Sequence, residues 1–176
     1  MPTVEFFFDC SSPWTYLAFD RIEALCEEEG AALVWKPILV GGVFNAVNRE
    51  LYELRANPNP RKAEYMGKDL QDWARLYGLR IRFPPTVFPV NSVKAMRGAF
   101  VAEEEDRLPT YARAVFEAYW RDDRDISRDE VLAPVVERVG LEPAAFFGKI
   151  ALPEIKAKLR ENTDELIRRG GFGSPT

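Results

Sequence analysis

The sequence predicts an α/β fold in which a βαβ unit is followed by a large helical region. Residues 4–8 form a short, β-prone apolar run, as in a buried strand. Ser12 and Pro13 form a strong helix start, with the serine as N-cap and the proline in the first turn. From residue 41 to 169, apolar side chains recur at helical spacing between turn residues, so helices are expected to dominate the chain.

The helix that follows Ser12 has an apolar face and is expected to stop at Gly30. Residues 31–37 then have the composition of a second strand. Because strands joined through a helix pair in parallel with a right-handed connection, residues 3–38 are expected to form the βαβ unit. The turn that holds Ser12 then lies at the carboxyl end of the first strand, where open α/β sheets bind their ligands.

Turn residues divide the remaining chain into segments. Residues 45–62 are expected to form a loop, because Asn-Pro-Asn-Pro at 57–60 is strong turn chemistry. Since a two-stranded parallel sheet is not stable alone, we expect a third strand to begin at 172–176 and the sequence to be cut short there. The expected helices are 62–77, one capped by Asn91 or Ser92, 109–120, one opened by a capping box at Ser127-Arg128-Asp129-Glu130, and two begun by Pro143 and Pro153, the last closing at Gly170-Gly171.

Composition excludes several classes of function. The chain has 176 residues and a net charge of -4, with 28 acidic against 24 basic side chains, which argues against a nucleic-acid partner. It has no histidine, so imidazole-based hydrolases and histidine metal sites are excluded. Two cysteines are too few for a disulfide scaffold or a four-cysteine site, and we expect no metal. With neither a secretory signal nor a long apolar run, the sequence predicts a cytoplasmic protein with no membrane partner.

Ser12 is the candidate functional residue, although a helix cap alone explains a Ser-Pro pair. A helix N-terminus carries unpaired N–H groups and a partial positive charge, which favour a thiolate over a thiol, and a serine hydroxyl donates one more hydrogen bond. Cys10 precedes the helix and Cys26 lies late in it, so neither is placed to act as the nucleophile at the helix start. We expect both to be small buried hydrophobic residues.

Six short segments, in order along essentially the whole chain, carry a resemblance. They are FFDCSSPWTYLA at 7–18, GGVF at 41–44, PRKAEYM at 60–66, FPVNS at 88–92, AMR at 95–97 and GFGSPT at 171–176. Together they resemble the 2-hydroxychromene-2-carboxylate isomerases. That family belongs with kappa-class glutathione transferases and bacterial disulfide oxidoreductases in one thioredoxin-like group with an inserted helical domain.

The resemblance implies a thioredoxin-like core interrupted by an all-helical domain. Residues 1–40 would be the first part of the core, 41–169 the inserted domain, and 170–176 the return to the core. Pro175 matches the cis-proline of that fold. The disulfide oxidoreductases carry Cys-x-x-Cys at the first helix start, whereas this chain has Ser12-Pro13-Trp14-Thr15. A redox oxidoreductase is therefore not expected.

Glutathione is the cofactor that the resemblance implies. In the family the matching serine contacts the sulfur of reduced glutathione, so Ser12 is the expected catalytic and cofactor-binding residue. We expect the thiolate of the cofactor to be the nucleophile and Ser12 to activate it, since no base is in evidence to deprotonate a serine. Ser174, just before Pro175, matches the position whose main chain pairs with the cysteinyl part of glutathione.

The family also has a glutathione-binding asparagine and lysine after the first strands. Asn48 and Asn57 compete for the first role, and Asn48 ranks slightly ahead because it follows Gly-Gly-Val-Phe at the shorter spacing. Each is also explained as a turn residue. Lys62 is the candidate to pair with a glutathione carboxylate. Alternatively, it is a solvent-exposed residue at the start of its helix. The same two interpretations apply to Arg61.

The implied activity is isomerisation of 2-hydroxychromene-2-carboxylate to trans-o-hydroxybenzylidenepyruvate by reversible thiolate addition and bond rotation. Trp14 and residues 83–89 are candidates to line a pocket for this small aromatic substrate. For residues 83–89, however, core packing and a rigid polyproline connection are the preferred interpretation. The alternatives are a kappa-like glutathione transferase with another electrophile and a non-enzymatic thioredoxin-fold module. Dimers are usual in this group, so a homodimer is expected.

Overall fold

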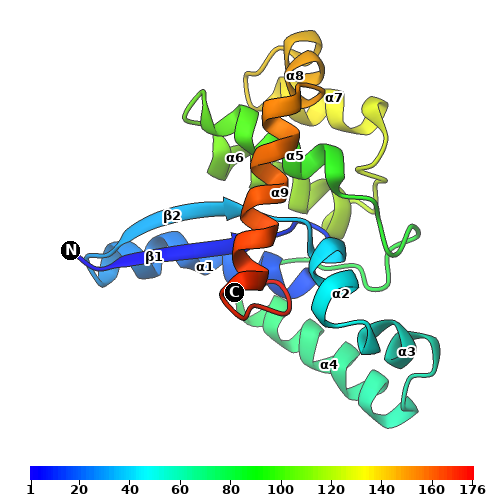
Figure 1. The fold of residues 1–176 in the computed structure, drawn as a ribbon. Coiled ribbons are helices and arrows are strands. Elements are labelled where there is room, and N and C mark those ends of the chain that lie inside the picture. Colours follow the sequence, from blue (N-terminus) through cyan, green and yellow to red (C-terminus); the bar gives the residue numbers. More distant parts are fainter.

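The computed structural model describes residues 1–176 and begins with the expected βαβ unit (Figure 1). β1 (Thr3–Phe8) and β2 (Ala32–Pro37) are parallel neighbours, with each residue of β1 opposite one residue of β2. α1 (Pro13–Glu28) connects them and begins directly after Ser12, as predicted. Gly30 follows α1 with a φ of +61°, a conformation that favours glycine and lets the chain turn into β2.

The last residues of the chain return to β1 on the edge opposite β2. Thr176 and Phe7 exchange both main-chain hydrogen bonds, at 2.9 and 3.2 Å, which is the pattern of a directly opposed antiparallel pair. The sheet itself has two strands, so the third strand expected at 172–176 is represented by this one pair of residues.

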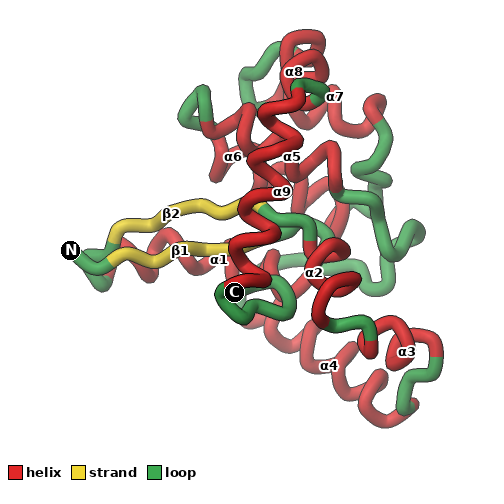
Figure 2. The backbone as a smooth tube through the Cα atoms, viewed as in Figure 1, coloured by secondary structure: helices red, strands yellow, loops and turns green.

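Helices make up most of the remaining chain (Figure 2). In Figure 1, α9 runs from the helical region back to the sheet and brings the C-terminus beside β1. α8 and α9 begin with their prolines in the first turn, as predicted. The helices are α2 (Val40–Val47), α3 (Glu50–Ala56), α4 (Pro60–Leu76), α5 (Val93–Glu103), α6 (Leu108–Phe116), the π-helical turn η1 (Glu117–Arg121), α7 (Asp129–Arg138), α8 (Pro143–Ile150) and α9 (Pro153–Arg168).

The loop expected over residues 45–62 is wrong, because α3 and the first turn of α4 lie within it. The Asn59 side chain accepts hydrogen bonds from the main-chain N–H groups of Arg61 and Lys62. The Asn-Pro pair therefore opens a helix here, because an asparagine N-cap followed by proline is as good a helix start as it is a turn.

The capping box expected at Ser127 is also wrong. The Ser127 hydroxyl donates to the Asp125 carboxylate at 2.6 Å, and α7 begins only at Asp129. The Ser127 hydroxyl bonds to this nearby carboxylate and so does not cap α7. The helix expected over 109–120 exists, but it changes from α6 into η1 after Phe116.

One continuous hydrophobic core joins the βαβ unit to the helical region. Phe8 and Phe19 of the βαβ unit are fully buried in it, together with Phe116 and Trp120 from the helices. Phe19 packs against Phe116 with a ring-centroid distance of 5.1 Å. No helix is long and apolar enough to cross a membrane.

Gly98 lies at the closest approach of α5 to its neighbours. A Cβ atom at this position would collide with the Phe146 ring and the Tyr111 hydroxyl, which donates to the Ala95 carbonyl oxygen at 3.0 Å. We expect Gly98→Ala to lower the free energy of unfolding by about 1–3 kcal/mol in urea denaturation, because an overpacked core must shift.

Gly148 supplies the matched control for this prediction. It lies within α8 with nothing within 4 Å of an added Cβ atom, so Gly148→Ala should raise stability by about 0.5–1 kcal/mol through helix propensity. Equal effects of the two substitutions would contradict the packing argument.

Candidate functional site

Asp9 fastens the carboxyl end of β1 to two other elements. Its side chain is fully buried, and its two carboxylate oxygens accept from the Ser11 N–H at 2.9 Å, the Val40 N–H at 2.8 Å and the Ser92 hydroxyl at 3.1 Å. Burial raises the pKa of Asp9, and these hydrogen bonds partly oppose the shift. Asp9 thus holds the turn before Ser12 against the starts of α2 and α5.

Ser12 caps α1 and reaches across to the end of the chain. Its Oγ accepts from the Thr15 N–H at 3.2 Å and donates to the Ser174 carbonyl oxygen at 3.0 Å. The Trp14 N–H makes no hydrogen bond within the chain, and Pro13 has no main-chain N–H group. No basic side chain is hydrogen-bonded to the Ser12 hydroxyl. Ser12 therefore lacks the general base that a serine nucleophile needs, but it can donate a hydrogen bond.

Ser174 and Pro175 lie directly beside Ser12, and the bond between them is cis, as predicted. The Ser174 hydroxyl accepts from the Asp9 N–H at 3.1 Å and lies 2.8 Å from the Thr15 hydroxyl. The Ser174 main-chain N–H has no partner. This segment therefore offers a free main-chain donor next to the Ser12 hydroxyl.

The structure brings Asn48, but not Asn57 or Lys62, to this segment. The Asn48 side-chain amide donates to the Phe172 carbonyl oxygen at 3.2 Å. Asn57 follows α3 as an exposed residue without a side-chain hydrogen bond. Lys62 and Arg61 lie in the first turn of α4, which Figure 1 shows beside α3 and away from the sheet. The roles of these residues toward a cofactor stay predictions.

Both cysteines are buried, as expected. Burial raises the pKa of the Cys10 thiol well above its usual value, and the charge of Asp9 adds to the shift. The main chain of Cys10 accepts from the Trp120 indole N–H at 2.9 Å and donates to the Met96 sulfur at 3.3 Å. No thiol of this chain is exposed at the helix start.

An aromatic wall stands near the same turn. Phe83, Phe88 and Trp120 contact one another with ring-centroid distances of 5.5 to 6.4 Å, and Phe88 is 36% exposed. Trp14 is half-buried and packs against the main core. Residues 83–89 lie outside any helix or strand, and the Phe83–Pro84 and Phe88–Pro89 bonds are cis.

Arg55 of α3 is a residue that sequence analysis missed. Its guanidinium lies over the rings of Phe44 and Phe88, at 5.4 and 5.5 Å from their centroids, and makes no ion pair or hydrogen bond. Phe44 also lies beside Gly173. Sequence analysis predicts a loop for this segment, and no local signal marks this arginine.

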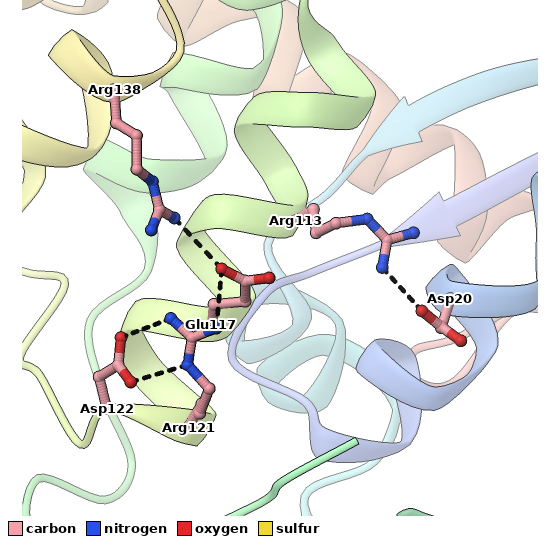
Figure 3. Close-up of polar contacts among 6 residues, drawn as sticks. All are labelled: Asp20, Arg113, Glu117, Arg121, Asp122 and Arg138. Carbon is pink, nitrogen blue, oxygen red and sulfur yellow. Dashed lines mark hydrogen bonds and ion pairs between the residues drawn. The ribbon is translucent and has the colours of Figure 1, made fainter. Parts of the chain in front are cut away.

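Ion pairs brace the helix that carries Trp120 (Figure 3). Glu117 accepts from Arg121 at 3.2 Å and from Arg138 at 3.3 Å, and Arg113 pairs with Asp20 of α1 at 2.7 Å. Burial, with the nearby charge of Glu117, raises the pKa of Tyr16 to about 12, so this phenol is neutral at physiological pH.

Comparison with known proteins agrees with this fold. A family model of the DSBA-like thioredoxin domain matches residues 3–176. The 2-hydroxychromene-2-carboxylate isomerase of Pseudomonas putida is 30% identical over 98% of this chain and 83% of its own length. The glutathione S-transferase kappa 1 of Homo sapiens is 29% identical over 98% of this chain and 79% of its own length.

The likeness extends to three dimensions. A solved structure of a 2-hydroxychromene-2-carboxylate isomerase aligns with a TM-score of 0.81 and 30% identity, covering 99% of this chain and 83% of that one. The chain therefore belongs to the family of DSBA-like thioredoxin domains and is related over nearly its whole length to the 2-hydroxychromene-2-carboxylate isomerases.

Proposed function

We propose that this protein is a glutathione-dependent isomerase that converts 2-hydroxychromene-2-carboxylate to trans-o-hydroxybenzylidenepyruvate. The observation that carries the proposal is the Ser12 hydroxyl at the start of α1, 3.0 Å from the carbonyl oxygen that precedes cis-Pro175, with neither a cysteine nor a base beside it. The relatives named as isomerases and as a kappa-class transferase support the same type of role.

The donors at this turn fit a thiolate cofactor. The Ser12 hydroxyl, at the N-cap of α1, and the unpaired Trp14 N–H, in its first turn, lie where the partial positive charge of the helix favours an anion. The unpaired Ser174 N–H and the Ser174 carbonyl oxygen suit a main-chain contact to a peptide such as glutathione. Asn48, which bonds to the Phe172 carbonyl oxygen, would hold this segment in position.

In this role Ser12 is a hydrogen-bond donor. When bound, glutathione would supply the thiolate for reversible addition to the substrate, which would turn a double bond into a single bond free to rotate. Rotation about its Cα–Cβ and Cβ–Oγ bonds allows Ser12 to redirect its proton from Ser174 toward the sulfur. Charge-assisted bonds from the hydroxyl and the Trp14 N–H lower the thiol pKa, which raises the thiolate fraction at neutral pH.

Arg55 and the aromatic wall suit a substrate with an aromatic ring and a carboxylate. The Arg55 guanidinium contacts two aromatic faces, and it keeps its donors free because no acidic side chain pairs with it. The exposed edge of Phe88 supplies an apolar surface beside these donors. Arg55 would bind the substrate carboxylate while the ring packs on this wall.

The activity is tested by following chromene-carboxylate absorbance with the complete enzyme and a small amount of reduced glutathione. We expect many turnovers per glutathione and no loss of free thiol. A kappa-like transferase, which the human relative supports as the second candidate, would instead consume one thiol per product. Turnover that is unchanged without glutathione would contradict the proposal.

The role of Arg55 leads to a specific kinetic expectation. Arg55→Gln should raise the KM for the substrate about tenfold and change the glutathione affinity little, because one charge-assisted bond to the carboxylate is lost. Steady-state kinetics with each compound varied separately measures both values. Arg168→Gln is the control, since Arg168 is an exposed arginine of α9 without an ion pair. A loss of glutathione affinity alone would assign Arg55 to the cofactor instead.

A further inference from the structure

A pocket of about 300 Å³ lies away from Ser12, between α4, the segment after it, and the end of η1. All of its charged lining residues are arginines. Its volume is at the lower end of the range for small-ligand sites. The lining residues are Gln71, Arg75, Leu79, Arg80, Ile81, Arg82 and Arg121.

The walls of this arginine pocket are fixed by hydrogen bonds between elements. The Gln71 side-chain amide donates to the Ile81 carbonyl oxygen at 2.9 Å, which ties α4 to the segment after it. The Arg82 N–H donates to the Trp120 carbonyl oxygen at 2.7 Å, which ties that segment to η1. The pocket therefore exists before any ligand binds, so little ordering of the backbone is needed.

Arg121 forms a cationic wall in which all three guanidinium nitrogens already contact carboxylates. Its guanidinium donates to both carboxylate oxygens of Asp122 at 2.8 and 2.9 Å and pairs with Glu117 at 3.2 Å (Figure 3). These acidic residues do not line the pocket. Arg121 therefore contributes a fixed positive charge whose orientation is set from outside the pocket.

The other three arginines keep donors free for a ligand. Arg75 pairs with Asp72 through one terminal nitrogen at 2.6 Å, and Arg82 pairs with Asp123 through Nε at 3.2 Å. Arg80 makes no ion pair or hydrogen bond through its side chain. Since a guanidinium has five N–H donors, these three side chains leave most of theirs unused.

We propose that the arginine pocket binds a compact polyanion, a small molecule with at least two phosphate or carboxylate groups. Arginine is the residue that best recognises such groups, because its planar fork donates two parallel hydrogen bonds to one of them. A dianion could accept from Arg80, which has no ion pair, and from the unused donors of Arg75 and Arg82. The site is separate from Ser12 and does not depend on the proposed isomerase activity.

Calorimetric titration of the whole protein at low ionic strength tests this proposal, with inorganic pyrophosphate and citrate as separate probes. We expect one saturable site for at least one probe, and the better probe distinguishes the phosphate from the carboxylate class. Arg80→Gln should weaken binding about tenfold, and Arg75→Gln should also weaken it, because each removes charge-assisted donors. Physiological salt should weaken binding as well, since the pocket is open to solvent.

Arg168→Gln is the matched control, because Arg168 is an exposed arginine of α9 without an ion pair and does not line the pocket. This variant should bind the probes as the parent does. The proposal is overturned if neither probe gives saturable binding, or if Arg168→Gln weakens binding as much as Arg80→Gln does, which would mark a general effect of surface charge.

Discussion

Replacing Ser12 with alanine is expected to lower kcat/KM for glutathione-dependent isomerisation by about a hundredfold. The Ser12 hydroxyl donates to the Ser174 carbonyl oxygen at the start of α1, and loss of one preorganised donor to a reacting anion typically costs a factor of 10²–10³. Steady-state kinetics at neutral pH measures the loss. It should shrink at high pH, where free glutathione is itself ionised.

Ser12→Ala also removes a helix cap, so a second variant is needed to separate the two effects. Ser12→Ala should lower the free energy of unfolding by about 1 kcal/mol through loss of the cap. Ser12→Asp should not, because aspartate caps helices as well as serine does. Its negative charge repels a thiolate, so Ser12→Asp should be at least as inactive as Ser12→Ala. An active Ser12→Asp enzyme would mean that only the cap is important.

Replacing Asp9 with alanine is expected to lower the free energy of unfolding by about 3–5 kcal/mol. The substitution leaves the N–H groups of Ser11 and Val40 and the Ser92 hydroxyl without their acceptor, and each unsatisfied buried donor costs about 1–3 kcal/mol. Urea denaturation measures the change. Asp69→Ala is the control, because Asp69 lies on α4 without a hydrogen bond, and it should alter stability by about 0.5 kcal/mol or less.

The raised pKa of Asp9 adds a dependence on pH. A folded-state pKa above the ordinary 3.8 means that the folded protein binds the proton more tightly than the unfolded chain does. This contribution to stability is full below pH 3.8 and is lost as the pH rises through the raised pKa of Asp9. Asp9→Asn keeps one acceptor oxygen and does not titrate, so its stability relative to the parent should increase over that interval. A constant difference would contradict the burial of a titrating carboxyl group.

Local signals predicted the parts of the fold that local chemistry decides. Ser12 and Pro13 mark the start of α1 because a cap and a first-turn proline act within one turn of helix. Sequence analysis places the start of α4 in a loop, because asparagine before proline is equally typical of a turn and of a helix N-cap. Ser127 does not cap α7 because its hydroxyl donates a hydrogen bond to Asp125, two residues earlier.

The candidate site was predictable only in part. The nearness of Ser12 to Ser174 and Pro175 came from a family resemblance, since 162 residues separate the two serines and no local pattern relates them. The anchoring by Asp9 depends on Val40 and Ser92, which are 31 and 83 residues away. Arg55 was missed for the same reason, because its guanidinium lies over the ring of Phe88, which is distant in the sequence, as well as over the ring of Phe44.

Calorimetric binding of reduced glutathione to the parent and to Ser12→Ala at pH 7 tests most directly whether α1 stabilises a thiolate. Titrations in two buffers of different ionisation enthalpy count the protons released. We expect the parent to bind with release of close to one proton, and Ser12→Ala to bind more weakly with less release. Equal binding by both proteins without proton release would contradict a thiolate held by Ser12.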